Sequence, residues 1–318
     1  MKILVAGGAG FIGSHLCEKL LMEGHEVICV DNLITGSEKN VNHFKKDKKF
    51  ILLKHDVTLP LAQNMHADAV FHLASPASPN HHSLLSYHNL PMETMLVNTI
   101  GTLELLKFVM QNEAKFLFAS SSEVYGDPLE HPQKETYFGN VSAVGPRSVY
   151  DEAKRFGETI TFHFFRKYKI DIRIARIFNT YGPKMLKDDM RMIITFILEA
   201  LQGRPITLFG DGQQTRSLCY VDDMIDGLNR LMFLPNTRGE IINLGSTNEH
   251  TVLEYAEMIK KITKSKSLIV FSEKLPQDDP KKRKPDITQA QKILDWQPHI
   301  KLEEGLGKMI DYCKKNIL

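Results

Sequence analysis

A tyrosine and a lysine one helical turn apart are the residues best suited to acid–base chemistry. Tyr150 and Lys154 are four positions apart, so on a helix their side chains lie on the same face. A phenol with a pKa of about 10 is a weak base at neutral pH. An ammonium group about 4 Å away, at an effective dielectric of about 20, favours the phenolate by about 4 kcal/mol. We therefore expect Tyr150 to titrate near neutrality and to accept a proton from an alcohol, although a packed tyrosine beside a solvated lysine is the alternative.

The stretch Ala119-Ser-Ser-Ser-Glu-Val-Tyr-Gly-Asp127 places three hydroxyls and a carboxylate directly after the apolar run Lys115–Phe118. A solvated turn would explain this composition, because Ser, Gly and Asp often interrupt regular structure. A ligand-binding shelf would explain it as well, since open parallel sheets bind ligands beyond the carboxyl ends of their strands. The local sequence leaves both interpretations open.

A glycine-rich turn, Gly7-Gly8-Ala9-Gly10-Phe11-Ile12-Gly13, separates the first apolar run from the first helical pattern. Such glycines let the backbone approach a pyrophosphate, and the start of the following helix offers free N–H groups. Asp31 follows the second apolar run, where a carboxylate accepts hydrogen bonds from ribose hydroxyls and repels a 2′-phosphate. The pattern predicts a dinucleotide site that favours NAD over NADP. Asp56 is either a contact at the adenine end or a turn residue.

Apolar runs alternate with helical patterns through the first half of the chain. The strand-like runs are Ile3–Ala6, Val27–Val30, Ile51–Leu53, Ala69–Leu73, Phe116–Ala119 and Ile172–Ile177, and the helical patterns are Phe11–Glu23, Thr94–Gln111 and Tyr150–Tyr168. This alternation predicts an α/β fold with a doubly wound parallel sheet of the Rossmann type. Short segments bounded by Gly and Pro after residue 180 predict a smaller, interleaved α/β substrate domain. We expect residues 1–178 to bind NAD, residues 217–245 to return to that domain, and residues 179–318 to bind the substrate.

Composition narrows the class of protein. The chain has 318 residues, of which 42% are hydrophobic and 25% charged, with a net charge of +2, so nothing favours nucleic acid or a membrane surface as a partner. The four cysteines show no metal-type or redox-type spacing, which favours a reducing compartment. No apolar run approaches a membrane span, and the first strand leaves no room for a signal peptide. We expect a cytoplasmic protein without a metal site.

Together the motifs resemble the extended short-chain dehydrogenase/reductase family, from Met1 to about Trp296. Within this family the sequence is most similar to the branch that decarboxylates UDP-glucuronate to UDP-xylose. The similarity is carried by His72-Leu-Ala-Ser-Pro-Ala-Ser-Pro79, Ser121-Ser-Glu-Val-Tyr-Gly-Asp127, Gly145-Pro-Arg-Ser-Val-Tyr-Asp-Glu-Ala-Lys-Arg155, Arg173-Ile-Ala-Arg-Ile-Phe-Asn-Thr-Tyr-Gly-Pro183, Gln214-Thr-Arg-Ser-Leu-Cys-Tyr-Val221 and Lys284-Pro-Asp-Ile-Thr288. The glycine turn and the Tyr–Lys pair specify only the superfamily.

The resemblance implies roles for individual residues. NAD would take the C4 hydride of the sugar while Tyr150 takes the C4 hydroxyl proton, carbon dioxide would leave from the 4-keto intermediate, and the hydride would return. The implied catalytic residues are Tyr150, Lys154, Ser121, Glu123 and Arg216, with Glu123 and Arg216 handling the carboxylate and the protonation at C5. The implied NAD contacts are Gly7, Gly10, Phe11, Ile12, Gly13, Asp31, Asn32, Asp56, Val57, Leu73, Tyr150 and Lys154. The implied nucleotide-sugar contacts are Ser122, Asn179, Arg191, Arg216 and Arg283.

Three departures from the decarboxylase pattern leave the substrate open. Extra residues occur through 80–90, including His81, His82 and His88, for which a solvated loop is favoured over a metal site. Glu93 stands where a lysine is usual, and Met190 stands where a glycine is usual. The rivals are therefore a 4-epimerase, a 4-dehydrogenase or an atypical 4,6-dehydratase acting on a nucleotide sugar.

Two further features bear on these rivals and on assembly. Dehydratases carry Asp-Glu where this chain has Ser122-Glu123, and epimerases carry uncharged residues there. A dinucleotide-sensing regulatory protein is a remote alternative, because a sensor need not keep Tyr150, Lys154 and Ser121. The helices Thr94–Gln111 and Tyr150–Tyr168 predict a homodimer, since apolar residues recur at Leu96, Leu103, Leu106, Val109, Phe156, Ile160, Phe164 and Phe165.

Overall fold

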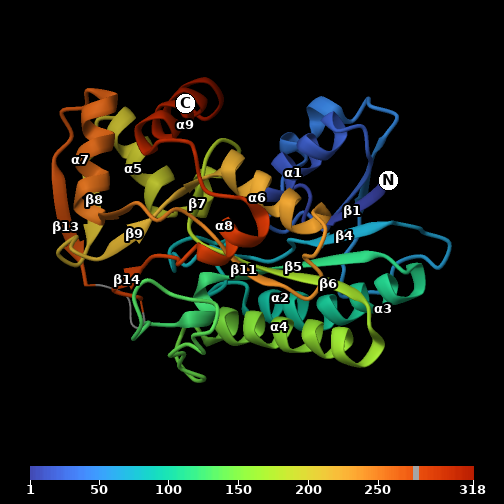
Figure 1. The fold of residues 1–318 in the computed structure, drawn as a ribbon. Coiled ribbons are helices and arrows are strands. Elements are labelled where there is room, and N and C mark those ends of the chain that lie inside the picture. Colours follow the sequence, from blue (N-terminus) through green and yellow to red (C-terminus); the bar gives the residue numbers. More distant parts are fainter. Residues whose placement is uncertain (275–278) are drawn as a thin grey trace.

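A parallel sheet forms the centre of the molecule (Figure 1). The computed structural model describes residues 1–274 and 279–318, and in this part of the chain the sheet has seven strands in the order β11-β6-β5-β4-β1-β2-β3. The strands are β1 (Lys2–Ala6), β2 (Glu26–Asp31), β3 (Phe50–Lys54), β4 (Ala69–His72), β5 (Lys115–Ser121), β6 (Asp171–Ile177) and β11 (Ile241–Leu244). The strand order reverses between β1 and β4, which is where doubly wound sheets bind their ligands. The predicted fold class is confirmed.

Helices cover both faces of this sheet (Figure 1). One face carries α1 (Phe11–Met22) and α6 (Val221–Phe233); the other carries α2 (Pro91–Leu96), α3 (Thr102–Asn112) and α4 (Ser148–Tyr168). The sequence of β1 explains this arrangement, because Ile3 and Val5 pack with the α1 side while Leu4 and Ala6 pack with the α3 side. A central parallel strand is buried on both faces, so it is apolar throughout.

The helix expected at Thr94–Gln111 begins earlier than predicted and is not regular. It starts with Pro91 at its first position, where the missing N–H is not needed. Between α2 and α3 lies η3 (Val97–Gly101), a π-helical turn, which the apolar periodicity of the sequence could not show. The other predicted elements agree with the observed ones to within one or two residues at their ends.

A smaller group of elements stands beside the sheet, at the left of Figure 1. Its strands are β7 (Thr180–Tyr181), β8 (Ile206–Phe209), β9 (Thr215–Ser217), β10 (Cys219–Tyr220), β12 (Glu249–Thr251), β13 (Ile269–Glu273) and β14 (Lys282–Arg283). Its helices are α5 (Met192–Leu201), α7 (Val252–Thr263) and α9 (Leu302–Asn316), whereas α8 (Thr288–Leu294) packs on β11 and α6. β9 pairs with β12 and with β14, and this pairing sets Arg216 opposite Arg283. Among the described residues, no helix is long and apolar enough to cross a membrane.

Asp223 on α6 fixes the segment that leads to α9. Its carboxylate accepts the backbone N–H groups of His299 and Ile300 at 3.1 and 3.0 Å. Its carbonyl accepts the indole N–H of Trp296 at 3.0 Å, and Trp296 is buried. Asp223 therefore contributes three hydrogen bonds that hold the segment before α9 to α6.

Replacing Asp223 with alanine should lower the free energy of unfolding by about 2–4 kcal/mol, because two N–H groups lose a charged acceptor. Urea denaturation would measure this change. Asp226→Ala on the same helix is the control, since in the described part of the chain Asp226 pairs only with Arg230 and both side chains are more than a third exposed. It should cost less than about 0.5 kcal/mol. Equal effects of the two substitutions would contradict the anchoring role of Asp223.

Candidate active site

The glycine-rich turn forms one end of a deep cleft at the carboxyl edge of the sheet. Gly7, Gly10, Phe11, Ile12 and Gly13 all line this cleft. A Cβ atom on Gly13 would lie 2.1 Å from the carbonyl oxygen of Gly7, whose own φ is +78°, so neither position accepts a side chain. Helix α1 begins here without a side-chain cap, so its first N–H groups remain available to an anion.

Asp31 and Asp56 lie next to this turn in the same cleft. The Asp31 carboxylate accepts the N–H groups of Ala9 and Leu33 at 3.0 and 2.8 Å, and burial raises its pKa more than these bonds lower it. Asp56 accepts the N–H of Thr58 at 2.9 Å and the amide of Asn32 at 3.1 Å. Asp56 therefore does form a turn, and it also faces the cleft. Val57 and Leu73 line the cleft as well.

The tyrosine and lysine lie together on α4, as their spacing predicts. The Lys154 Nζ atom is 5.6 Å from the centre of the Tyr150 ring and donates a hydrogen bond to the Ala119 carbonyl at 2.8 Å. Ser121, the last residue of β5, hydrogen-bonds Tyr150. All three side chains line the cleft, so β5 and α4 bring together the groups of a proton relay.

The expected low pKa of Tyr150 is wrong for the protein alone. Burial raises the pKa of Tyr150 to about 12, outweighing the hydrogen bond from Ser121. Burial also lowers the pKa of Lys154 to about 7, despite the opposing charge of Glu158. A pKa of Tyr150 near neutrality would require a fully charged Lys154 in a partly polar medium, whereas desolvation disfavours the charged form of both groups.

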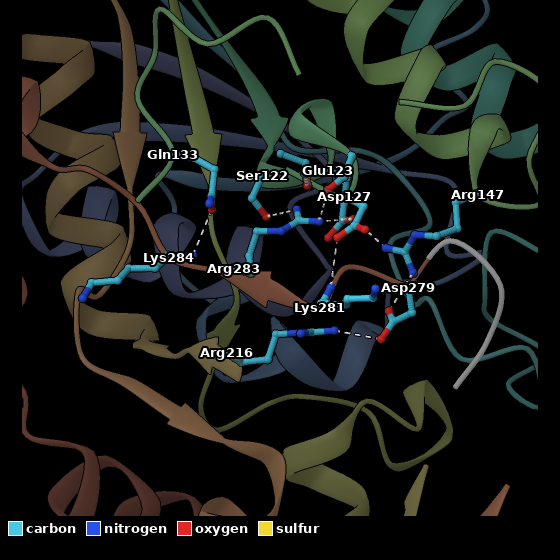
Figure 2. A network of polar contacts seen from close by, with 12 residues as sticks. Ser122, Glu123, Asp127, Gln133, Arg147, Arg216, Asp279, Lys281, Arg283 and Lys284 are labelled. Atoms are coloured by element: carbon cyan, nitrogen blue, oxygen red, sulfur yellow. Dashed lines mark hydrogen bonds and ion pairs between the residues drawn. The ribbon is translucent and has the colours of Figure 1, made fainter. Parts of the chain in front are cut away.

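Glu123 lies where two arginines from distant parts of the chain meet (Figure 2). It belongs to η4 (Ser122–Tyr125), the helical turn that follows β5. Its carboxylate accepts hydrogen bonds from Arg147 at 2.5 Å and from Arg283 at 3.2 Å. Arg283 also donates to the Ser122 hydroxyl at 3.0 Å. The stretch after β5 is therefore a buried charge cluster and not a solvated turn.

The cluster holds two carboxyl groups in opposite protonation states. Burial alone would raise the pKa of Glu123, but the charges of Arg283 and Arg147 lower it to about 2. Burial and the nearby Glu123 charge raise the pKa of Asp151 to about 8. At neutral pH the site therefore contains an ionised Glu123 and a neutral Asp151, so Glu123 cannot act as an acid until it takes up a proton.

The remaining predicted substrate residues lie around this cluster. Arg216 donates to Asp279 at 2.8 Å, and Asp279 also accepts a hydrogen bond from Arg147 (Figure 2). Arg216 thus reaches the Glu123 cluster through Asp279 and Arg147. Arg191 and Asn179 line the cleft, and Arg191 forms a two-point ion pair with Asp189 at 2.8 and 2.6 Å.

The extra residues at 80–90 are only partly solvated: His81, His82, Leu84 and Asn89 are exposed, as expected, but the loop also packs on the protein. Asn80 donates to the carbonyl of Met190 at 2.7 Å, and the buried side chains of Ser83, Ser86 and Tyr87 face inward. The loop therefore packs on the segment that precedes Arg191. Met190 has a φ of +57°, a conformation that favours glycine, which explains why a glycine is usual at this position. In the described residues no group of three metal-ligating side chains occurs.

Tyr87, which sequence reasoning did not identify, lies in this loop against the relay. Its ring stacks on Tyr150 with centres 5.0 Å apart and planes 16° apart. Its hydroxyl is buried and has no hydrogen-bond partner within residues 1–274 and 279–318. Because buried hydroxyls are usually bonded, this one is available to a bound ligand.

Arg147 and Asp279 were also missed. Arg147 lies one helical turn before Tyr150, a spacing that could have drawn attention to it. Asp279 lies in a charged stretch near the chain's end, and no local pattern distinguishes it from a surface residue. Glu93, found where a lysine is usual, lines the cleft.

Comparisons with known proteins agree with this geometry. A model of the NAD dependent epimerase/dehydratase family matches residues 3–245. UDP-glucuronic acid decarboxylase 5 of Arabidopsis thaliana is 49% identical over 97% of this chain and 88% of that protein. UDP-glucuronic acid decarboxylase 1 of Danio rerio is 46% identical over 99% of this chain and 73% of that protein.

Solved structures show the same fold. The UDP-glucuronic acid 4-epimerase of Bacillus cereus, in complex with UDP-glucuronic acid and NAD, superposes with a TM-score of 0.87. It is 30% identical in sequence, and the match covers 99% of each chain. The chain therefore belongs to the NAD dependent epimerase/dehydratase family, within the extended short-chain dehydrogenases/reductases.

Proposed function

We propose that this protein decarboxylates UDP-glucuronate to UDP-xylose through a 4-keto intermediate. The observation that carries the proposal is the buried Glu123–Arg147–Arg283 cluster beside the Tyr150 relay. Guanidinium groups are suited to bind a sugar carboxylate, and the relay is suited to act on a neighbouring hydroxyl. The names of the Arabidopsis and Danio relatives support the same activity.

The residues at the start of α1 fit a dinucleotide. A side chain on Gly7 or Gly13 would fill the turn, and the uncapped helix start suits a pyrophosphate. Asp31 would accept hydrogen bonds from the ribose hydroxyls of NAD. Tyr150 and Lys154 would lie near the nicotinamide. NAD would supply a reversible hydride acceptor for C4 of the sugar.

The relay residues would act at the C4 hydroxyl. Ser121 would orient this hydroxyl, and Tyr150 would take its proton and later return it. The charge of Lys154 would stabilise the phenolate. Tyr87, whose ring stacks on that of Tyr150, would form a hydrogen bond to the sugar through its hydroxyl.

The arginine cluster would act at C5 and C6. Arg147 and Arg283 would hold the sugar carboxylate in line with the 4-ketone. When the C5–C6 bond breaks, carbon dioxide leaves and the electron pair moves onto the C4 oxygen as an enolate. Glu123 would then pass a solvent proton to C5. Arg216 and Arg191 would bind the diphosphate. Ser122 and Asn179 would contact other parts of the nucleotide sugar.

A 4-epimerase acting on the same substrate is the second candidate, favoured by the likeness to the Bacillus cereus enzyme. Both activities need the C4 relay, but only decarboxylation releases carbon dioxide. The charged cluster at Ser122-Glu123 favours decarboxylation, since an epimerase needs no group to process the carboxylate.

The domain division that we propose assigns 1–178 and 217–245 to NAD and the rest of 179–318 to the nucleotide sugar. The pairing of β11 with β6 supports the return of 217–245. We also propose a cytoplasmic location, supported by four buried cysteines that are free thiols, and a homodimer.

The homodimer proposal rests on the outer faces of α2, η3 and α4. Leu106, Val109 and Phe164 are buried against the sheet, but Leu96, Ile100 and Phe156 are 41%, 42% and 47% exposed. These three positions lie on helices that pack together. A second copy could cover this apolar strip in a four-helix contact.

Wild-type protein should convert UDP-glucuronate to UDP-xylose and carbon dioxide, as measured by mass analysis of the products. Glu123→Gln should lower turnover by about two to four orders of magnitude and accumulate bound NADH, because oxidation at C4 does not need this carboxylate. Tyr150→Phe should lower turnover similarly without NADH, because the C4 proton has no acceptor.

Thermal melting of both variants would show that they are folded. Near wild-type turnover by Glu123→Gln would make this carboxylate structural. Formation of the C4 epimer without carbon dioxide would replace decarboxylation with epimerisation.

The protein should bind NAD at least about tenfold more tightly than NADP, since a 2′-phosphate would meet the buried Asp31 charge. Asp31→Asn should narrow this ratio, and the exposed Asp47→Asn should leave it unchanged. Titration calorimetry with both cofactors would measure the ratio. Equal affinities in the wild type would contradict the role of Asp31.

Light scattering at micromolar concentration should give the mass of a dimer. Ile100→Glu combined with Phe156→Glu should give a monomer, because a charge cannot be buried unpaired in an apolar contact. Met22→Glu, at an 81% exposed site on α1, is the control and should remain dimeric. A monomeric wild type would exclude the proposed contact.

A further inference from the structure

The Asp279 carboxylate lies between two arginines that come from different parts of the fold (Figure 2). One oxygen is 2.8 Å from a terminal nitrogen of Arg216, on β9 of the small sheet. The other is 3.2 Å from a terminal nitrogen of Arg147, which directly precedes α4. Asp279 therefore links β9 of the small sheet to the start of α4 through its charge.

The two carboxylates bound by Arg147 are not held equally. Glu123 bonds both Arg147 and Arg283 and follows a strand of the main sheet. Asp279 lies between β13 and β14, and its bond from Arg147 is 3.2 Å long, against 2.5 Å for the bond from Arg147 to Glu123. Each carboxylate bonds two arginines and both are similarly buried, so the longer contact and the position outside the main sheet distinguish Asp279. Asp279 is therefore the partner that can leave.

The position that Asp279 occupies is suited to an anionic ligand. Within the described residues, Asp279 is the carboxylate that neutralises Arg216, whose other bond goes to the carbonyl of Thr215. Two guanidinium groups that share one carboxylate would also bind phosphate oxygens or a second carboxylate. Asp279 and such a ligand cannot occupy the same nitrogen atoms together.

We propose that Asp279 is an internal counter-ion that occupies the anion position between Arg147 and Arg216 and is displaced by the nucleotide sugar. The inference rests on the proposed function, because it assumes a ligand with a diphosphate or a carboxylate. Asp279 keeps the two arginines neutralised and in place before the ligand binds. It also lowers the affinity for the ligand, because both ion pairs must break first.

Removing the charge should therefore tighten binding. Asp279→Asn should lower the Kd for UDP by about three- to tenfold, because the ligand no longer has to displace a charged group from two arginines. Asp127→Asn is the matched control: Asp127 is in the same network but, among the residues that the structure describes, its carboxylate bonds the backbone N–H of Lys281 and no arginine. It should leave the Kd near the wild-type value. Titration calorimetry with UDP would measure all three proteins.

Two further variants test whether the gain in affinity for UDP comes from removing the Asp279 charge. Asp279→Ser removes the charge with a different side chain and should tighten binding to a similar extent. Adding Arg216→Ala to Asp279→Asn should abolish the gain, because the position for the anion no longer exists. Thermal melting without ligand would show that each variant is folded.

Comparing two ligands identifies the group that displaces Asp279. If it is the diphosphate, UDP alone shows the full gain. If it is the sugar carboxylate, the gain occurs only with UDP-glucuronate, measured in a Tyr150→Phe background that prevents turnover. Unchanged or weaker binding of both ligands to Asp279→Asn would overturn the inference. A wild type that binds UDP but releases no carbon dioxide would instead overturn only the proposed decarboxylation.

Discussion

The buried charge of Glu123 is the interaction on which the site depends. An ionised carboxylate is costly to bury unless cations and hydrogen bonds compensate it. Here Arg147 comes from the start of α4 and Arg283 from β14 of the small sheet. Next to this pair, the backbones of Gln133 and Lys284 are hydrogen-bonded at 2.9 Å. The requirement to compensate one carboxylate thus ties the start of α4 and the small sheet to the turn after β5.

Helix α4 gives the cleft two electrostatically different ends. Arg147 precedes its first turn and lies with the charged cluster, whereas Lys154, two turns later, lies in apolar surroundings against Phe118. Burial leaves Tyr150 neutral and lowers the pKa of Lys154 to about 7. The end of the cleft at Arg147 can hold anions. The end at Tyr150 and Lys154 can transfer a proton with little change in its own net charge. Because one helix carries both ends, their separation is fixed by its geometry.

What could be predicted from the sequence was local. The strands of the main sheet have strong apolar patterns, the glycine turn lies within seven residues, and Tyr150 and Lys154 share one helix. The pKa values of Tyr150 and Lys154 depend on burial, which cannot be inferred from the spacing of the two residues in the sequence. The contact between Arg147 and Asp279 joins residues 132 positions apart. Tyr87 was missed because the loop that carries it is positioned by bonds to residues near 190, which no pattern within the loop indicates.

The charges in the cluster explain why its two carboxylates should behave differently. Arg147, Arg216 and Arg283 supply three positive charges, and Glu123 and Asp279 supply two negative ones, which leaves an excess of one. UDP-glucuronate carries negative charge on its diphosphate and on its carboxylate, so a cluster that kept both resident carboxylates would attract it weakly. Moving Glu123 away would leave Arg283 buried without its partner, which is costly. Moving Asp279 away leaves one terminal nitrogen of Arg147 paired with Glu123 and frees the other, together with Arg216, for a new anion. The cluster can therefore accept a ligand between Arg147 and Arg216 while the Glu123 charge stays in place.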